Sequence, residues 1–84
     1  MKFTVIWKPS AEQELAQLWE DADDRCDISM ASDAIDRRLA ESADRAGESR
    51  DGDDRIDFER PLGIRFRVSL ADRKVLVLNV WRTE

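Results

Sequence analysis

Two neighbouring stretches in the C-terminal half alternate polar and apolar residues, and they constrain the fold more than any other feature of the chain. The first runs from Arg55 to Arg60 and the second from Ile64 to Leu70. Alternation with a period of two is typical of a strand with one dry face and one solvated face. The residues Pro61-Leu62-Gly63 lie between them, and Pro and Gly suit the first and last positions of a three-residue hairpin turn. The sequence therefore predicts an antiparallel hairpin.

The predicted turn also fixes how residues pair across this hairpin. Apolar residues should face one another on the dry side, and residues of opposite charge should face one another on the solvated side. The expected pairs are Phe58 with Phe66, Ile56 with Val68, Glu59 with Arg65 and Asp57 with Arg67. On this interpretation the two arginines are salt-bridged on a solvated face, where such pairs contribute only about 0–1 kcal/mol of stability.

A further strand is expected from Val75 to Trp81, after a turn at Asp72-Arg73. It is apolar on both sides apart from Asn79, which is typical of a central strand or of one whose outer face is covered.

This last strand raises a question of exposure. If the hairpin follows the expected turn, Leu76, Leu78 and Val80 share a side with Arg65 and Arg67. A monomer does not normally expose three such aliphatic side chains together. Either the register slips by one residue and buries them, or a partner covers them.

The beginning of the chain is predicted to form a short strand followed by a helix. The strand runs from Lys2 to Trp7, and Pro9 ends it. Ser10 and Gln13 match a capping box, which predicts a helix from about Ala11 to Asp23. Its apolar stripe consists of Ala11, Leu15, Leu18, Trp19 and Ala22.

A second helix follows after a short break. Asp27 is the expected cap, and the helix runs to about Arg45. Its apolar stripe is Ile28, Ala31, Ile35, Leu39, Ala43 and Ala46. Gly47 is suited to end it in the left-handed conformation, and a polar loop from Glu48 to Asp54 leads to the first of the paired strands.

The expected order is strand, helix, helix and three strands. The apolar stripes of a helical hairpin need an apolar surface to cover, and the dry face of the sheet supplies it. We therefore predict one α+β domain, residues 1–84, with two layers: a helical hairpin packed on a mainly antiparallel four-stranded sheet. The first strand is expected beside the last.

Composition excludes several classes of site. The net charge of −5 argues against broad binding to nucleic acid or to an anionic membrane. The chain has no His, and the spacing of Asp21, Asp23, Asp24 and Asp27 does not match a calcium loop, so no metal or cofactor is expected. Cys26 has no His partner and reads as an inert thiol. Without a signal-like start or a long apolar run, the chain reads as cytoplasmic.

Several segments together resemble the RelE/ParE superfamily of bacterial type II toxin–antitoxin toxins. The stretch from Val5 to Leu15 is similar to that family's first strand and capped helix. Gly63 to Val68 is similar to its glycine and arginine element, and Val77 to Arg82 is similar to its last strand. The resemblance covers nearly the whole chain.

The resemblance implies a toxin that inhibits growth, takes part in plasmid stabilisation and is silenced by a cognate antitoxin. In the RelE branch, basic residues on the outer sheet face cleave messenger RNA on the ribosome. Arg65 matches that branch's strand arginine, and Arg82 falls on its C-terminal basic position or one residue from it. The positions where RelE carries lysines hold Asp57 and Glu59, or Ile56 and Phe58 if the alignment shifts by one residue, and neither pair is basic. Carboxylates would repel a phosphate there, so nuclease activity is disfavoured and the chain looks closer to the ParE branch, which acts on DNA gyrase.

Three functions therefore stay open. The first is a ParE-like toxin, the second is an mRNA endonuclease using Arg65, Arg67 and Arg82, and the third is a non-toxic member that only binds. For target or antitoxin contact we expect residues on the last two strands, namely Arg65, Arg67, Leu76, Leu78, Val80, Trp81 and Arg82. The three tryptophans, Trp7, Trp19 and Trp81, are expected to serve packing rather than stacking.

Overall fold

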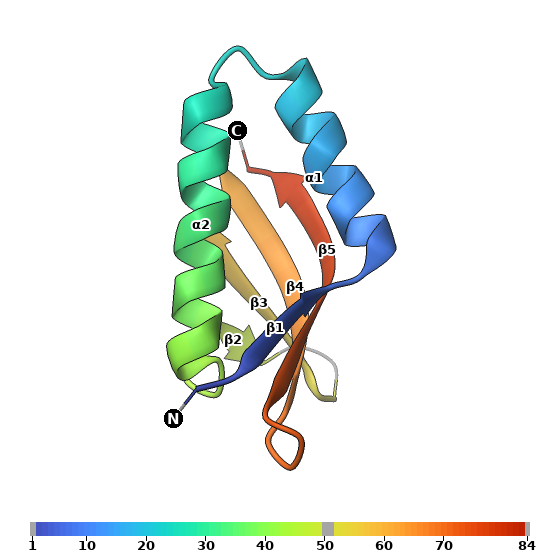
Figure 1. Ribbon diagram of the computed structural model, residues 1–84, viewed down its shortest axis with the longest axis vertical. Coiled ribbons are helices and arrows are strands. Elements are labelled where there is room, and N and C mark those ends of the chain that lie inside the picture. The colour runs from blue at the N-terminus through green and yellow to red at the C-terminus, as the bar shows by residue number, and fades with distance from the viewer. Residues whose placement is uncertain (1, 50–51, 84) are drawn as a thin grey trace.

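Helices and strands follow one another in the predicted order, with one additional short strand. The computed structural model describes residues 2–49 and 52–83. The N-terminal half of this described chain forms β1 (Thr4–Trp7), α1 (Pro9–Asp21), α2 (Arg25–Ser42) and β2 (Glu48–Ser49). The C-terminal half forms β3 (Asp54–Glu59), β4 (Leu62–Ser69) and β5 (Lys74–Arg82). Both helices lie on one side of the sheet (Figure 1), so the predicted two-layer α+β architecture is confirmed.

The strands of the described chain form one sheet in the order β1-β5-β4-β3-β2. β1 runs parallel to β5, and all other neighbours are antiparallel. The predicted place of the first strand beside the last is therefore confirmed. β2 lies in the stretch where the sequence predicts a loop, because a strand of two residues is too short for a period to be detected. Residues 50 and 51 of that stretch lie outside the described residues.

Both helices begin earlier than the sequence predicts. α1 begins at Pro9, whose missing N–H and fixed φ suit the first helical turn, so the expected N-cap at Ser10 is wrong. α2 begins two residues before the expected cap at Asp27 and ends three residues before Arg45. Gly47 does adopt the predicted left-handed backbone, with a φ of 67°.

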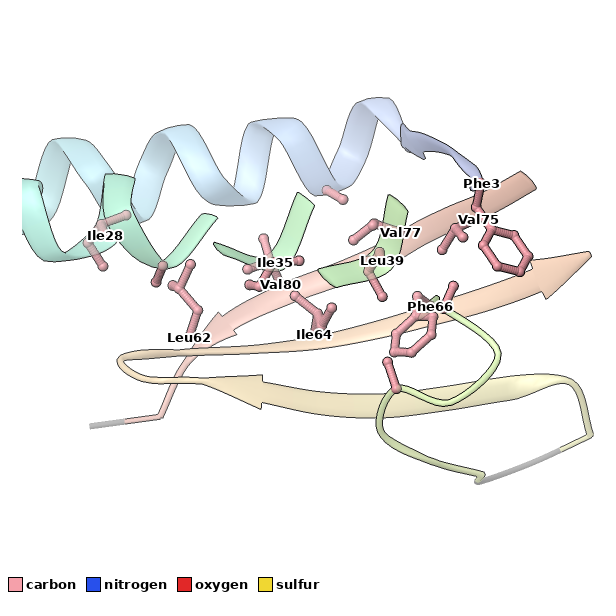
Figure 2. Close-up of a cluster of buried hydrophobic side chains, with 14 residues drawn as sticks. Phe3, Ile28, Ile35, Leu39, Leu62, Ile64, Phe66, Val75, Val77 and Val80 are labelled. Carbon is pink, nitrogen blue, oxygen red and sulfur yellow. The ribbon is translucent and has the colours of Figure 1, made fainter. Parts of the chain in front are cut away.

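The core lies between the helices and the inner face of the sheet. The predicted stripe of the second helix and the turn after it is fully buried: Ile28, Ala31, Ile35, Leu39, Ala43 and Ala46. Figure 2 shows Ile35 and Leu39 facing the sheet residues Ile64 and Phe66. α1 packs through Leu15, Leu18 and Ala22, which are partly buried, whereas Trp19 is 43% exposed and does not belong to the core.

The pairing of β3 with β4 differs from the predicted register. Phe58 lies opposite Gly63 rather than Phe66, a slip of three residues (66 minus 63). Only Arg60 and Pro61 connect the two strands, since Glu59 already pairs with Leu62. All four predicted cross-strand pairs are therefore wrong. Because three is an odd number, the slip also exchanges the two faces of β3.

The exchange turns the polar face of β3 toward the helices. Asp57 and Glu59 lie on the helix side, where Arg38 of α2 binds both of them over 2.9 Å and 2.7 Å. Phe58, predicted to be dry, is 54% exposed on the opposite side. Phe66 is buried on the inner face as predicted.

The pairing of β4 with β5 contains a bulge that changes sides partway along the strand. Arg65 faces Asn79 while Phe66 faces Val77, so Leu78 faces no residue of β4. A bulge leaves one residue unpaired and alters the alternation beyond it. As a result Val80 is buried, 3% exposed, so of the two alternatives left open by the sequence the shift of register holds for this residue, and Val80 does not share the outer side with Leu76.

None of the helices formed by the described residues is long and apolar enough to cross a membrane.

Candidate functional site on the outer sheet face

The face of the sheet that points away from the helices carries most of the residues predicted for contact. We call it the outer face. Because directly paired residues share a side, the pairing of the strands assigns its members. They are Ile6, Asp54, Ile56, Phe58, Gly63, Arg65, Arg67, Leu76, Asn79 and Trp81.

A buried carboxylate joins the two predicted arginines at the centre of this face. Asp54, 5% exposed, accepts bonds from Nε and Nη2 of Arg65 at its Oδ2, over 3.0 and 2.6 Å. Its Oδ1 accepts a bond of 2.8 Å from Nε of Arg67. The sequence correctly predicts that both arginines are ion-paired, but their partner is Asp54 rather than Glu59 and Asp57. The slip of register explains this difference, because it sets Asp54 directly opposite Arg67.

The electrostatics of this cluster follow from its hydrogen bonds. The hydrogen bond from Arg67 is the largest cause, and the one from Arg65 the second, of a pKa of Asp54 below its ordinary value, because both bonds stabilise the carboxylate. Two guanidinium groups and one carboxylate leave a formal charge of +1 (2 minus 1). Any phosphate that approached Arg65 would have to compete with Asp54 for its N–H groups.

An aromatic pair lies at one end of the outer face. Phe58 and Trp81 meet edge to face, with ring centroids 6.3 Å apart and an interplanar angle of 83°. Gly63 lies between them in the sheet, and a Cβ added there would come within 2.6 Å of the Trp81 indole. Gly63 is therefore required for close packing, and its predicted place in the turn is wrong. Sequence reasoning missed Phe58 because it assigned this residue to the dry side.

Aliphatic side chains lie at the other end, on the first and last strands. Ile6 of β1 pairs with Leu76 of β5, and Leu76 in turn pairs with Arg67 of β4. Ile6 is 43% exposed, while Leu76 and the bulged Leu78 are half-buried. The outer face thus combines apolar ends with a central arginine pair.

Arg82 does not belong to this cluster, although the sequence predicts that it acts together with Arg65. It pairs with Leu62, whose side chain is in the core, so it lies on the helix side. There it donates to both oxygens of Asp24, over 3.0 Å and 2.7 Å. These bonds lower the pKa of Asp24 and connect the end of β5 to the turn between the helices.

A second surface feature lies on the helical hairpin. Leu15, Trp19 and Ile28 line a groove of about 340 Å³ with acidic residues at its rim. Arg25 stacks over the Trp19 ring at 4.7 Å and donates to the Trp19 carbonyl oxygen over 3.0 Å, which fixes the ring in place. Within the described residues, no group of three or more acidic or Cys side chains is arranged to hold a metal ion.

Comparison with known proteins gives structural similarity alone. No protein-family model and no curated protein matches the sequence. The fold matches a chain of the toxin–antitoxin complex RelBE2 from Mycobacterium tuberculosis, with a TM-score of 0.79 and 15% identity, covering 98% of this chain and 99% of that one. It also matches a chain of the chromosomal ParDE toxin–antitoxin system from P. aeruginosa, with a TM-score of 0.75 and 19% identity over 99% and 98% of the two chains. The chain therefore has the RelE/ParE-like fold that its sequence resembles.

Proposed function

We propose that this chain is the toxin of a type II toxin–antitoxin system and that a cognate antitoxin holds it inactive. The observation that carries the proposal is the match in fold, nearly end to end, to chains from two toxin–antitoxin complexes. The same family is reached independently from the sequence, through the glycine and arginine element and the last strand.

We further propose that the outer face is the surface that contacts the antitoxin or the target. Apolar side chains at both of its ends, among them Ile6 and Phe58, are exposed, which is typical of a surface that a partner covers. Of the contact residues predicted from the sequence, the strand pairing retains Arg65, Arg67, Leu76 and Trp81 on this side, and Leu78 is the half-buried residue at the bulge. Val80 and Arg82 are set aside because their side chains lie on the helix side.

The ParE-like reading is favoured for the target, with DNA gyrase as the enzyme that the resemblance implies. Asp54 occupies the arginine pair, and this carboxylate is unfavourable beside a scissile phosphate. Asp57 and Glu59 are bound to Arg38 on the helix side, so the expectation that they stand beside a phosphate on the outer face is wrong. The β3 residues on the outer face are Asp54, Ile56 and Phe58, and none of them is basic.

One observation favours the second candidate, cleavage of mRNA. Phe58 and Trp81 lie on the same face as Arg65, and aromatic and arginine side chains are the types that hold single-stranded bases by stacking. The ion pairs that Asp54 makes with both arginines weigh against it, because a phosphate would have to compete with this carboxylate. A non-toxic binding protein is the third candidate.

Expression of the chain alone in bacteria separates these functions. The ParE-like toxin should arrest growth and induce DNA-damage signalling, whereas an mRNA endonuclease should cause rapid loss of translated messages. Absence of arrest would contradict the toxin proposal and favour the binding protein.

The contact surface is tested by co-purification with the protein encoded by an adjacent reading frame. Leu76→Asp on the outer face should abolish co-purification, while Gln13→Asp on the exposed side of α1 should leave it intact. If both variants retain the partner equally well, the outer face is not its binding surface.

A further inference from the structure

Asp54 occupies the hydrogen-bonding edges of both outer-face arginines that an external anion would use. Nε and Nη2 of Arg65 converge on its Oδ2 over 3.0 and 2.6 Å, and Nε of Arg67 donates to its Oδ1 over 2.8 Å. The planar fork of a guanidinium group binds carboxylate and phosphate oxygens in the same manner. In this chain an internal carboxylate therefore takes the place of an external anion.

The members of this cluster differ in exposure. The side chain of Asp54 is 6% exposed, whereas the side chains of Arg65 and Arg67 are 38% and 54% exposed. A carboxylate that is removed from water needs a cation beside it, but a guanidinium group that faces solvent needs no anion. Within the described residues, all hydrogen bonds that these two guanidinium groups donate go to Asp54. Loss of its charge would therefore leave both arginines able to bind another anion.

The side chains around the arginines are of the kinds that bind single-stranded nucleic acid. Asn79 is exposed and pairs directly with Arg65, so the two side chains are cross-strand neighbours. Phe58 and Trp81 add aromatic rings farther along the same face. Basic side chains for phosphates, polar groups for base edges and aromatic rings for stacking make up the sites that bind single strands. The outer face differs from such a site by the carboxylate of Asp54.

Another acidic residue on the outer face is Glu48 of β2. It pairs with Ile56, and Ile56 pairs in turn with Arg65, so a residue of β3 separates Glu48 from the guanidinium group. Glu48 is exposed, and solvent screens an exposed charge at that separation. Asp54 is therefore the acidic residue whose contact with the arginines decides what they can bind.

We propose that Asp54 sets the specificity of the outer face: it is an internal substitute for a phosphate, which excludes nucleic acid and reserves the surface for a protein partner. A phosphodiester that displaced Asp54 from Arg65 would leave a buried carboxylate without part of its pairing. A protein can instead contact the exposed apolar side chains of Ile6 and Phe58 without disturbing the cluster. The inference deepens the proposed function and rests on it only for the statement that the partner is a protein.

The test is a gain of binding to a short oligouridylate. Asp54→Asn removes the charge with little change of shape, and Glu48→Gln makes the same change of charge elsewhere on the same face. The affinity is measured at low ionic strength by NMR, from the signals of the Nε–H groups of Arg65 and Arg67. Asp54→Asn should bind the oligouridylate about tenfold more tightly than the wild type, or better, because the guanidinium fork is then open to phosphate. Glu48→Gln should change the affinity by less than about twofold.

A second substitution connects the gained affinity with the arginines. In the Asp54→Asn background, Arg65→Gln should remove the gain, with both variants folded by circular dichroism. A merely structural role of Asp54 would weaken the fold and would not create binding. If Asp54→Asn does not fold, Asp54→Ser removes the same charge with a smaller side chain and replaces it. If neither folds, the wild type decides: Nε–H signals that stay unchanged with oligouridylate support the exclusion, and signals that move overturn it.

Three results with folded variants would overturn the proposal. They are equal affinity of the wild type and Asp54→Asn for the oligouridylate, no binding by any variant, and an equal gain in Glu48→Gln. Growth arrest by the wild-type chain is measured in a separate experiment. Failure of this inference therefore leaves the toxin proposal in place, and absence of arrest leaves the measured specificity of the face unchanged.

Discussion

Arg38 of α2 donates to the carboxylate of Asp57 in β3 over 2.9 Å, and this bond explains why β3 turns its polar face toward the helices. The same guanidinium binds Glu59 over 2.7 Å and the carbonyl oxygen of Phe58. One side chain thereby makes the inward-facing carboxylates compatible with a position next to the core. The partners are 34%, 19% and 35% exposed for Arg38, Asp57 and Glu59, so the interaction is partly screened by solvent.

Replacing Arg38 should therefore destabilise the fold. Arg38→Met keeps the apolar stem but leaves two carboxylates without their cation, and we expect a loss of about 1–2 kcal/mol in the free energy of unfolding. Arg37→Met, which changes the exposed neighbour on the same helix, should cost less than about 0.5 kcal/mol. Urea denaturation of the three proteins measures both values. Equal stability of the two variants would mean that Arg38 does not hold β3.

The two phenylalanines of the hairpin provide a direct test of its register. Phe66→Ala removes a ring that is fully buried and should cost about 3–5 kcal/mol. Phe58→Ala removes a ring that is 54% exposed and contacts Trp81 by its edge, so it should cost about 1 kcal/mol or less. With the register predicted from the sequence, both rings would be dry and the costs similar. Denaturant unfolding of the two variants therefore distinguishes the two pairings.

The apolar stripe of the second helix and the inner face of β4 could be predicted from the sequence because each depends on a local period. The apolar stripe from Ile28 to Ala46 recurs in steps of three and four residues and is buried throughout. The place of β1 followed from the order of the elements. These features need no knowledge of contacts between distant residues.

The outer face could not be predicted in the same way, because it depends on register. Two local features decide which residues lie on the outer face: the short connection at Arg60 and Pro61, and the bulge at Leu78. The connection leaves the alternation of polar and apolar residues in β3 and β4 intact, and β5 is apolar on both sides, so the bulge interrupts no sequence pattern. Neither change is therefore visible in the sequence of a single strand. The inward turn of Asp57 depends on Arg38, which is 19 residues away in the sequence. Alternation predicts two faces, but only the tertiary contact decides which one is buried.

Gly63 is predicted to be sensitive to the smallest enlargement. A Cβ at this position would lie 2.6 Å from the Trp81 indole, so Gly63→Ala should force the ring to move and cost about 1–3 kcal/mol. Trp81→Leu removes the obstructing ring, and in that background the same substitution should cost much less. A double-mutant cycle of unfolding free energies measures this coupling. A cost that is unchanged in the Trp81→Leu background would show that the ring is not the cause.

The central cluster should make stability depend on pH in the acid range. Bonds from Arg67 and Arg65 lower the pKa of Asp54 in the folded chain below its value in the unfolded chain. The unfolded chain therefore binds a proton first on acidification. The stabilisation by this carboxylate is complete above the ordinary Asp value of about 3.9 and is lost progressively below it. Asp54→Asn should be less stable than the wild type at neutral pH, and the difference should shrink as the pH falls below about 3.9. Asp53→Asn, which changes the exposed neighbouring carboxylate, is the control. Urea unfolding across this range measures the difference, and a gap between wild type and Asp54→Asn that stays constant with pH would contradict the assignment of Asp54 as the shared partner of the two arginines.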